Sequence, residues 1–146
     1  MNKLELHELI ELYTSTMNEV NRRVNVIMND KVHQELTTDQ FGTLRFLDKH
    51  QPTTSTEIAN EFSIGKSAVT AQVNRLFERG LIDRRRDEED RRIVYLQLTE
   101  KGKALVEEGT ERLYEVLGDI LTQFSKEEVT TFVHSLEKLV TILRER

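Results

Sequence analysis

The chain has 146 residues and a mass of 17.1 kDa, which suits one domain with helical extensions. With 37% hydrophobic and 32% charged residues it is polar for a single deep core, so we expect an elongated, mainly helical protein that completes its core against a second copy. The absence of cysteine excludes disulfides, thiol catalysis and thiolate metal sites. No apolar run reaches the roughly 18 residues of a membrane span, and residues 1–20 do not resemble a signal peptide, so we expect a cytoplasmic protein.

The net charge of −5 argues at first against a nucleic-acid partner, but the charges are unevenly distributed. Residues 64–101 contain nine basic and seven acidic side chains, a local charge of +2, and the rest of the chain carries −7. The middle of the sequence is therefore its basic part, and a polyanion would bind there.

The first predicted element is a long amphipathic helix from Leu4 to about Met28, with apolar residues at steps of three and four. A second helix follows in LTTDQFGTLRFLDKH, where Thr37 and Gln40 form a capping box and Pro52 ends the segment. Its apolar stripe is Phe41, Leu44 and Leu47.

Two shorter helices come next, separated by the break SIG at 63–65. Thr54 and Glu57 form a capping box for the first, whose inward residues are Ile58, Ala59 and Phe62. The second spans residues 66–79 and is closed by Gly80. Its predicted apolar face is Val69, Val73, Leu76 and Phe77.

Residues 81–98 change to the alternating period of β-strands and predict a two-stranded antiparallel ribbon. The connection RRDEED lacks Asn-Gly and Asp-Gly, which predicts a wide exposed loop. Thr99 then begins a helix to about Phe124, and Ser125 with Glu128 caps the last helix. In the first of these two helices, the residues expected to face the protein interior are Ala104, Leu105, Leu113, Val116, Leu117, Ile120 and Leu121.

Two short helices, a capped third helix and a β-ribbon form the layout of a winged helix-turn-helix, and the helix at 66–79 is the candidate DNA reader. Its outward face is short, polar or basic, as insertion into a major groove requires. An ordinary amphipathic helix with a polar outer face is the alternative interpretation. The candidate contact residues on this helix are Lys66, Ser67, Thr70, Ala71, Gln72, Asn74 and Arg75.

The loop of the ribbon and the strand ends beside it carry both arginines and acidic residues. Arginine at the tip of an exposed loop fits a narrow minor groove, and Asp90 is close enough to Arg92 to orient its guanidinium. We expect the acids to hold the arginines, whereas a solvated charge cluster of little energetic value is the alternative. The candidate contact residues of this wing are Arg84, Arg85, Arg86, Asp90, Arg91 and Arg92.

Residues 67–102, SAVTAQVNRLFERGLIDRRRDEEDRRIVYLQLTEKG, resemble the multiple antibiotic resistance regulator (MarR) family of bacterial transcription factors. The similarity lies in Val69-Thr70, Arg75-Leu76, Gly80-Leu81-Ile82, Arg84, Asp90-Arg91-Arg92, Leu98-Thr99 and Gly102, and the motif match extends over 36–102. One residue departs from the pattern: Ala71 stands where the family often has arginine. A methyl packs on a thymine methyl but cannot bind guanine, so the operator preference of other members does not transfer.

The resemblance implies a ligand-responsive repressor acting as a homodimer on a pseudo-palindromic operator, with Arg92 in the minor groove and Asp90 bracing it. It implies dimerisation helices at 1–34 and 100–146 around a winged helix-turn-helix at 35–99. The apolar stripes of the first and last helices also favour a dimer, since burial at about 25 cal/mol per Å² would stabilise it by several kcal/mol. The alternative is that the long helices pack only within one chain. A dimer would place the reader helices about 34 Å apart.

The signal that would control such a regulator is not evident in the sequence. His7, His33, His50 and His134 are widely spaced, which speaks against a metal-responsive regulator, although His33 and Glu35 could flank a metal. Tyr13, Met17, Phe41 and Phe46 could line a pocket for an aromatic effector or simply form core. We predict no metal, no cofactor and no ligand residues.

Two other classes of function fit the sequence less well. An enzyme is not favoured, because no phosphate-binding loop, paired carboxylates or nucleophile set is evident. A winged-helix module that binds protein instead of DNA would present an apolar or acidic reader face, in contrast to the basic and polar one at 66–75.

Overall fold

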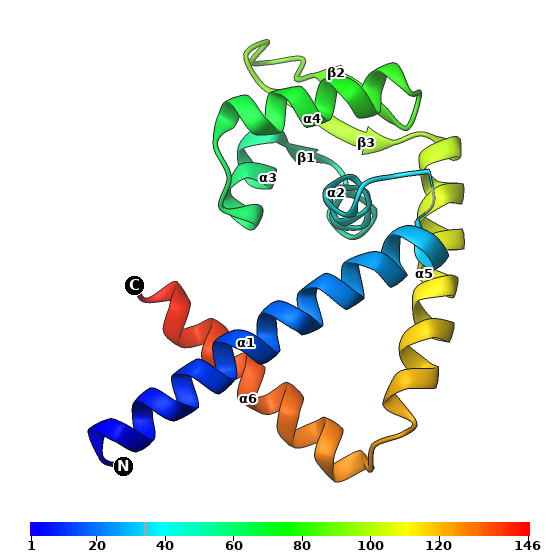
Figure 1. The fold of residues 1–146 in the computed structure, drawn as a ribbon. Coiled ribbons are helices and arrows are strands. Elements are labelled where there is room, and N and C mark those ends of the chain that lie inside the picture. The colour runs from blue at the N-terminus through cyan, green and yellow to red at the C-terminus, as the bar shows by residue number, and fades with distance from the viewer. Residues whose placement is uncertain (34) are drawn as a thin grey trace.

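The computed structural model describes residues 1–33 and 35–146. The elements, in chain order, are α1 (Lys3–Ile27), the π-helical turn η1 (Met28–Val32), α2 (Thr38–Lys49), β1 (Thr53–Thr54), α3 (Ser55–Phe62), α4 (Lys66–Glu78), β2 (Ile82–Arg86), β3 (Val94–Leu98), α5 (Glu100–Leu121) and α6 (Lys126–Arg144). Figure 1 shows α2, α3, α4 and the sheet gathered in one lobe, with α5 leading away from it and α1 and α6 at the opposite end. The protein is thus a mainly helical winged helix-turn-helix with long flanking helices.

Side-chain caps begin most of the helices, as the sequence predicts. The side chains of Thr37, Thr54 and Ser125 each accept a hydrogen bond from the backbone N–H of the third residue after them. That residue is Gln or Glu, and its side chain accepts a hydrogen bond from the backbone N–H of the capping residue. Thr99 caps α5 through the N–H of Gly102. These predicted helix starts are confirmed because capping depends on local spacing alone.

The sheet has three antiparallel strands in the order β1-β3-β2, one more than the sequence predicts. In the wing, β2 pairs with β3 from Ile82 opposite Leu98 to Arg86 opposite Val94. The additional strand β1 pairs Thr53 with Leu96 on the other edge. Two residues are too few to show an alternating pattern, so β1 leaves no periodic signal in the sequence. The loop at 87–93 is wide and exposed, as predicted.

The core lies within the lobe and at its junction with α5. Leu44 and Leu47 of α2, Ile58 of α3 and Leu76 of α4 are fully buried there. Two predictions of inward-facing residues are wrong: Phe62 is 38% exposed and Phe77 is 43% exposed. Both lie at the ends of short helices, beyond the part that neighbouring elements cover. Phe62 contacts Phe46 edge-on, and Phe77 is covered by an arginine of the wing described below.

The long helices leave their apolar stripes uncovered within one chain. All residues of α1 and α6 are described and none of them is buried. In α5, Ala104 is exposed, as are Leu117, Ile120 and Leu121 near the C-terminal end, which corrects their predicted placement inside. The reason is that the single chain supplies no neighbour there. No helix in the described part of the chain has the length and apolar character to cross a membrane.

Candidate nucleic-acid interface

The candidate reader helix is α4, and its burial separates two faces. Val69, Val73 and Leu76 pack into the lobe. Ser67, Ala71 and Asn74 follow one another at helical spacing on the opposite side, with Ser67 and Asn74 exposed and Ala71 half-buried. Lys66, Thr70 and Arg75 are exposed on the flanks of this face. The turn before α4 has Ser63 in the left-handed conformation at φ 51°, which ends α3 and redirects the chain into α4.

Gln72 does not lie freely on the outward face. Its Oε1 accepts a hydrogen bond of 2.6 Å from the hydroxyl of Thr43 in α2, whose side chain is 1% exposed. This bond joins the candidate reader helix to the helix behind it. Gln72 therefore helps to fix the position of α4, and its amide nitrogen remains available to donate to a ligand.

Arg84 on β2 connects the wing to α4. Its guanidinium lies 4.4 Å from the centre of the Phe77 ring and donates a short hydrogen bond to Oδ1 of Asn74. The ring shields one face of the guanidinium, and the exposed Phe77 is thereby covered by a cation. Wing and reader helix are consequently held together by a side-chain contact as well as by the backbone.

Asp87 organises the loop at the tip of the wing. Its Oδ1 accepts from the backbone N–H groups of Glu89 at 2.8 Å and Asp90 at 3.4 Å, and its Oδ2 accepts from the Tyr95 hydroxyl at 3.1 Å. These donors, the Glu89 N–H above all, lower the pKa of the Asp87 carboxyl, while the carboxylate raises the pKa of Tyr95. This acid therefore shapes the loop backbone and does not hold an arginine.

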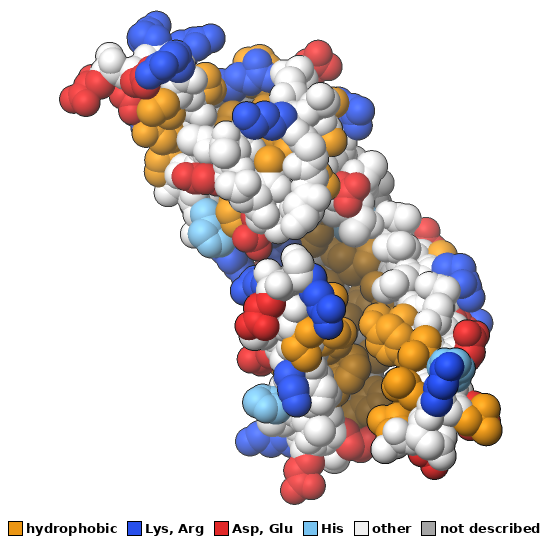
Figure 2. All heavy atoms as spheres, turned by 90° about the vertical axis from the view of Figure 1, so that its left-hand side faces the viewer, with side chains coloured by type: hydrophobic (Ala, Val, Ile, Leu, Met, Phe, Trp, Pro, Cys, Tyr) orange, Lys and Arg blue, Asp and Glu red, His pale blue; other side chains and the backbone are white. Residues whose placement is uncertain are grey.

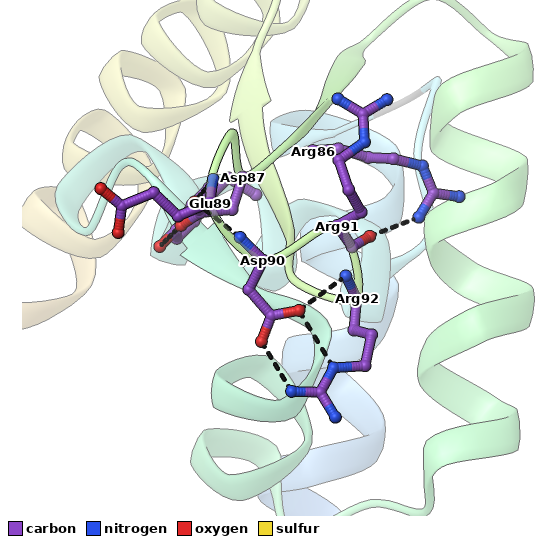
Figure 3. Close-up of polar contacts among 7 residues, drawn as sticks. Arg86, Asp87, Glu89, Asp90, Arg91 and Arg92 are labelled. Carbon is purple, nitrogen blue, oxygen red and sulfur yellow. Dashed lines mark hydrogen bonds and ion pairs between the residues drawn. The ribbon is translucent and has the colours of Figure 1, made fainter.

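Asp90 and Arg92 form a bidentate ion pair at the end of the same loop (Figure 3). Arg92 Nε donates to Asp90 Oδ1 at 3.0 Å and its NH2 to Oδ2 at 2.9 Å, while the Arg92 N–H donates to Oδ1 at 3.1 Å. The guanidinium lowers the pKa of Asp90, and the carboxylate raises the pKa of Arg92. The Arg92 side chain is still 91% exposed, so the arginine is oriented and remains accessible. The predicted pairing is confirmed.

The other wing arginines are held by groups that are not acids. Arg85 lies 5.4 Å from the ring centre of its cross-strand neighbour Tyr95, and Arg86 donates to the carbonyl of Arg91 at 2.7 Å. Within the described residues of the wing, Asp90 and Arg92 form the single ion pair, so the expectation that several acids restrain the arginines holds for one acid only. For Arg84, Arg85 and Arg86, aromatic rings, the Asn74 amide oxygen and a backbone carbonyl take that role.

Arginines and lysines cluster at one end of the molecule, and apolar surface gathers at the other end among further charged side chains. Figure 2 shows Lys and Arg side chains projecting from the tip of the lobe beside a few acids, and hydrophobic side chains lining a hollow between the long helices at the other end. A groove between α4 and the wing is lined by Thr70, Asn74, Arg84 and Arg86, among others. The structure thus brings residues of the reader helix and the wing onto one surface.

Sequence reasoning missed the residues that support this surface. Thr43 positions Gln72, and Phe77 positions Arg84. Asp87 shapes the loop, and Tyr95 positions Arg85. Tyr95 could have been inferred, since the strand register places it opposite Arg85. The partners of Gln72 and Arg84 carry no such signal, because they come from other helices.

The predicted metal and effector candidates lie elsewhere. His33 is 4% exposed; its Nδ1 contacts the Leu36 carbonyl at 2.8 Å and its Nε2 the Thr38 hydroxyl at 3.3 Å. No three histidines or carboxylates gather as metal ligands among residues 1–33 and 35–146. Phe41 is a core residue at 3% exposure, whereas Tyr13 is 55% exposed on α1.

Comparison with known protein families points to DNA-binding regulators. The family model described as "MarR family" matches residues 36–94, which span α2 to the start of β3. The HTH-type transcriptional repressor MdtR of Bacillus subtilis is 32% identical over 106 residues, covering 73% of this chain and 68% of its own.

Solved structures resemble the chain over almost its whole length. A MarR family protein from Bacillus stearothermophilus is 30% identical, with a TM-score of 0.77 and 99% of each chain covered. Streptococcus pneumoniae FabT in complex with DNA is 25% identical, with a TM-score of 0.79, covering 96% of this chain and 98% of its own. The similarity therefore includes the long flanking helices as well as the lobe.

Proposed function

The chain belongs to the MarR family of helix-turn-helix transcriptional regulators that bind DNA, and we propose that it acts as a homodimeric repressor on a pseudo-palindromic operator. The observation that carries this proposal is the ion-paired, 91% exposed Arg92 at the tip of a wing that is joined to the polar helix α4. An oriented cation beside a reader helix fits the adjacent grooves of one DNA duplex.

The homodimer is supported by the uncovered apolar stripes. On α1, Leu9 and Tyr13 are 51% and 55% exposed, and on α6, Phe132 and Leu143 are 58% and 60% exposed. Contiguous apolar surface of this kind marks an interaction site, and a second copy offers the same stripes in return. We therefore assign dimerisation to residues 1–34 and 100–146 and DNA binding to residues 35–99.

In this proposal α4 enters the major groove and the wing reaches the neighbouring minor groove. The reader contacts are Lys66, Ser67, Thr70, Ala71, Gln72, Asn74 and Arg75, and the wing contacts are Arg84, Arg85, Arg86, Arg91 and Arg92, with Asp90 as the brace. Basic side chains on the flanks bind phosphates and fix the register, while the central residues face the base edges. Two lobes related by a two-fold axis would contact half-sites about one duplex turn apart.

Repression and its control are the finer parts of the proposal. The similarity to MdtR, which is named a repressor, supports the direction of regulation. We place the control point where η1 and α5 meet, because a small pocket there is lined by apolar and charged side chains together. Its lining residues are Val32, His33, Glu35, Leu36, Leu105, Glu108, Gly109 and Arg112. A small molecule bound there would change how the lobe sits on the dimerisation helices.

The experiment is fluorescence anisotropy with the DNA upstream of the protein's own gene and with operator DNA selected from a random pool, across a salt series. We expect saturable binding that weakens with salt at a slope near −0.9 per neutralised phosphate, and a stoichiometry of two chains per site. Binding that is insensitive to salt, or no enrichment of any DNA sequence, would contradict the proposal. The protein-binding alternative would then become the better interpretation of the same surface.

A further inference from the structure

The centre of the reader face carries no long side chain that could read guanine. Ala71 lies between Ser67 and Asn74 along the middle of the outward face, and its side chain ends at a methyl group. Arg75 and Lys66 lie to either side of this line on α4. The base pair opposite Ala71 is therefore met by a methyl group, whereas guanine is usually recognised by arginine or lysine.

The side-chain oxygen of Asn74 is already in a hydrogen bond within the protein. An asparagine that recognises adenine accepts a hydrogen bond from N6 and donates one to N7. The Asn74 Oδ1 already accepts from the guanidinium of Arg84, which is itself held over Phe77. The amide nitrogen forms no hydrogen bond within the described part of the chain, and this group can donate to an acceptor on a base edge.

Gln72 and Thr70 also form hydrogen bonds within the protein, one as acceptor and the other as donor. The Gln72 Oε1 accepts from the hydroxyl of the buried Thr43, which leaves its amide nitrogen. The Thr70 hydroxyl donates back to the Lys66 carbonyl at 2.9 Å. The two amide oxygens thus accept hydrogen bonds within the protein, and their amide nitrogens remain available to donate to a ligand. The Thr70 hydroxyl has donated its hydrogen and can only accept, and its methyl group adds apolar surface to the face.

A groove of mixed polarity next to Ala71 adds apolar surface to the methyl group. It runs between α2 and α4, and its apolar side is formed by Phe62, Ile64, Ala68 and Ala71, while Thr38, Asp39 and Arg75 are among its polar and charged residues. Ile64 is 39% exposed at its rim. In the major groove, thymine presents an acceptor and a methyl group, whereas cytosine presents an amino donor and adenine an amino donor next to N7.

We propose that each operator half-site has a thymine opposite Ala71, whose C5-methyl group packs against Ala71 and the adjoining groove. This inference rests on the DNA-binding function proposed above and names the base that this function recognises. The amide donors of Gln72 and Asn74 complement the thymine O4 and do not complement the amino group of cytosine. Guanine also offers acceptors, but it has no methyl group for Ala71 to contact, so the methyl contact is what selects thymine. Ala71 is accordingly a residue that determines specificity.

The test uses the full-length protein and the operator obtained by selection. Each thymine of one half-site is replaced in turn by deoxyuridine, which lacks only the C5-methyl group. We expect one substitution to weaken wild-type binding about four-fold, and about 15-fold when both half-sites carry it, as the loss of one buried methyl contact each predicts. In Ala71→Gly the difference between thymine and deoxyuridine operators should fall below two-fold, because only the groove contact remains, whereas Ala104→Gly, at an exposed position of α5, should retain the wild-type difference.

A second variant tests the same residue by a change of preference. Ala71→Arg should select guanine in place of that thymine, because arginine binds O6 and N7 of guanine. The inference is overturned if the wild type binds a selected operator specifically while every deoxyuridine substitution changes affinity less than two-fold. If no sequence is selected at all, the DNA-binding proposal itself has failed, and this outcome differs from the first.

Discussion

Gly102 lies directly against the backbone of Leu81: a Cβ atom at position 102 would be 2.1 Å from the Leu81 carbonyl oxygen. The same oxygen accepts a hydrogen bond of 3.1 Å from the backbone N–H of Thr99. The first turn of α5 is therefore packed on the residue that precedes β2. This contact ties the base of the wing to the helix that leads to the dimerisation end.

Gly102→Ala should destabilise the fold. The methyl group cannot be accommodated by a side-chain movement, because the obstacle is backbone, so α5 must shift away from Leu81. We expect a loss of about 2–3 kcal/mol, the range for overpacking, even though alanine is the better helix former. Thermal unfolding followed by circular dichroism should show a midpoint lower by about 5–10 °C.

Gly65→Ala is the matched control, since no atom lies within 4 Å of a Cβ at that position. Its φ of −72° suits any residue, so the change should cost no more than about 1 kcal/mol, as for an N-cap substitution. Equal unfolding midpoints for the two variants would show that the close approach at Gly102 has no energetic consequence.

Arg92→Ala should weaken operator binding about 5- to 150-fold, the range expected for loss of a specific arginine contact. Asp90→Asn should cause a smaller loss, because it releases the guanidinium from its paired contact without removing it. Anisotropy titrations at fixed salt measure both. Arg23→Ala removes an exposed arginine that is paired with Glu19 on α1, and it should bind like the wild type. An Asp90→Asn protein that binds as weakly as Arg92→Ala would mean that the carboxylate does more than orient the arginine.

The two wing carboxylates should respond differently to loss of Arg92. Asp90 owes its lowered pKa first to the Arg92 side chain, whereas Asp87 owes its lowered pKa to the backbone N–H groups of Glu89 and Asp90. In Arg92→Ala the pKa of Asp90 should rise toward its ordinary value of 3.8, and that of Asp87 should remain low. Carbon-detected NMR titration of the carboxyl groups distinguishes the two.

The sign of the pH effect follows from the direction of these shifts. A carboxyl whose pKa is lower in the folded protein stabilises the fold at pH above its ordinary value, and this contribution is lost as the pH falls through the lowered value. The ordered wing should therefore persist at neutral pH and loosen only in acid below the ordinary pKa of 3.8. Loss of the Asp90 to Arg92 contact near pH 6 would contradict this account.

Much of the fold could be predicted from the sequence because its signals are local. Thr37 with Gln40, Thr54 with Glu57 and Ser125 with Glu128 are capping pairs whose spacing alone fixes a helix start. The Asp90 to Arg92 pair is local in the same sense, being two residues apart on one loop. For this reason these helix starts and the Asp90 to Arg92 ion pair are predictable from the sequence, whereas the helix expected to reach about Phe124 ends at Leu121.

The parts that could not be predicted depend on contacts between distant segments. β1 exists because Thr53 and Thr54 pair with β3, and the side chain of Gln51 accepts from the Leu98 N–H at 2.7 Å. The helical position of Phe77 predicts a place in the core, but the ring lies at the surface and packs against the guanidinium of Arg84 in the wing. Local periodicity describes one helix at a time and cannot place a residue that a separate element covers.

The last prediction concerns the apolar stripe of α6. Phe132 is 58% exposed in the single chain and lies in line with Leu136 and Leu143 on this helix. If this stripe is buried between two copies, Phe132→Glu removes two aromatic contacts per dimer, one from each chain, and buries two charges. At about 1.5–3 kcal/mol for each side chain, the dimer should weaken roughly 100-fold or more. Sedimentation equilibrium across a concentration series measures the shift toward monomer.

Thr131→Glu adds the same charge at the neighbouring exposed position, which points away from the stripe, and it should leave the dimer intact. Operator binding should follow the oligomeric state, because a monomer holds one half-site and loses the gain from binding both halves at once. Phe132→Glu is therefore expected to bind DNA weakly although every proposed DNA contact is retained. If the Phe132→Glu protein remained dimeric, the proposed packing of the helices would be wrong. If it became monomeric yet bound the operator as well as the wild type, one lobe would suffice for recognition.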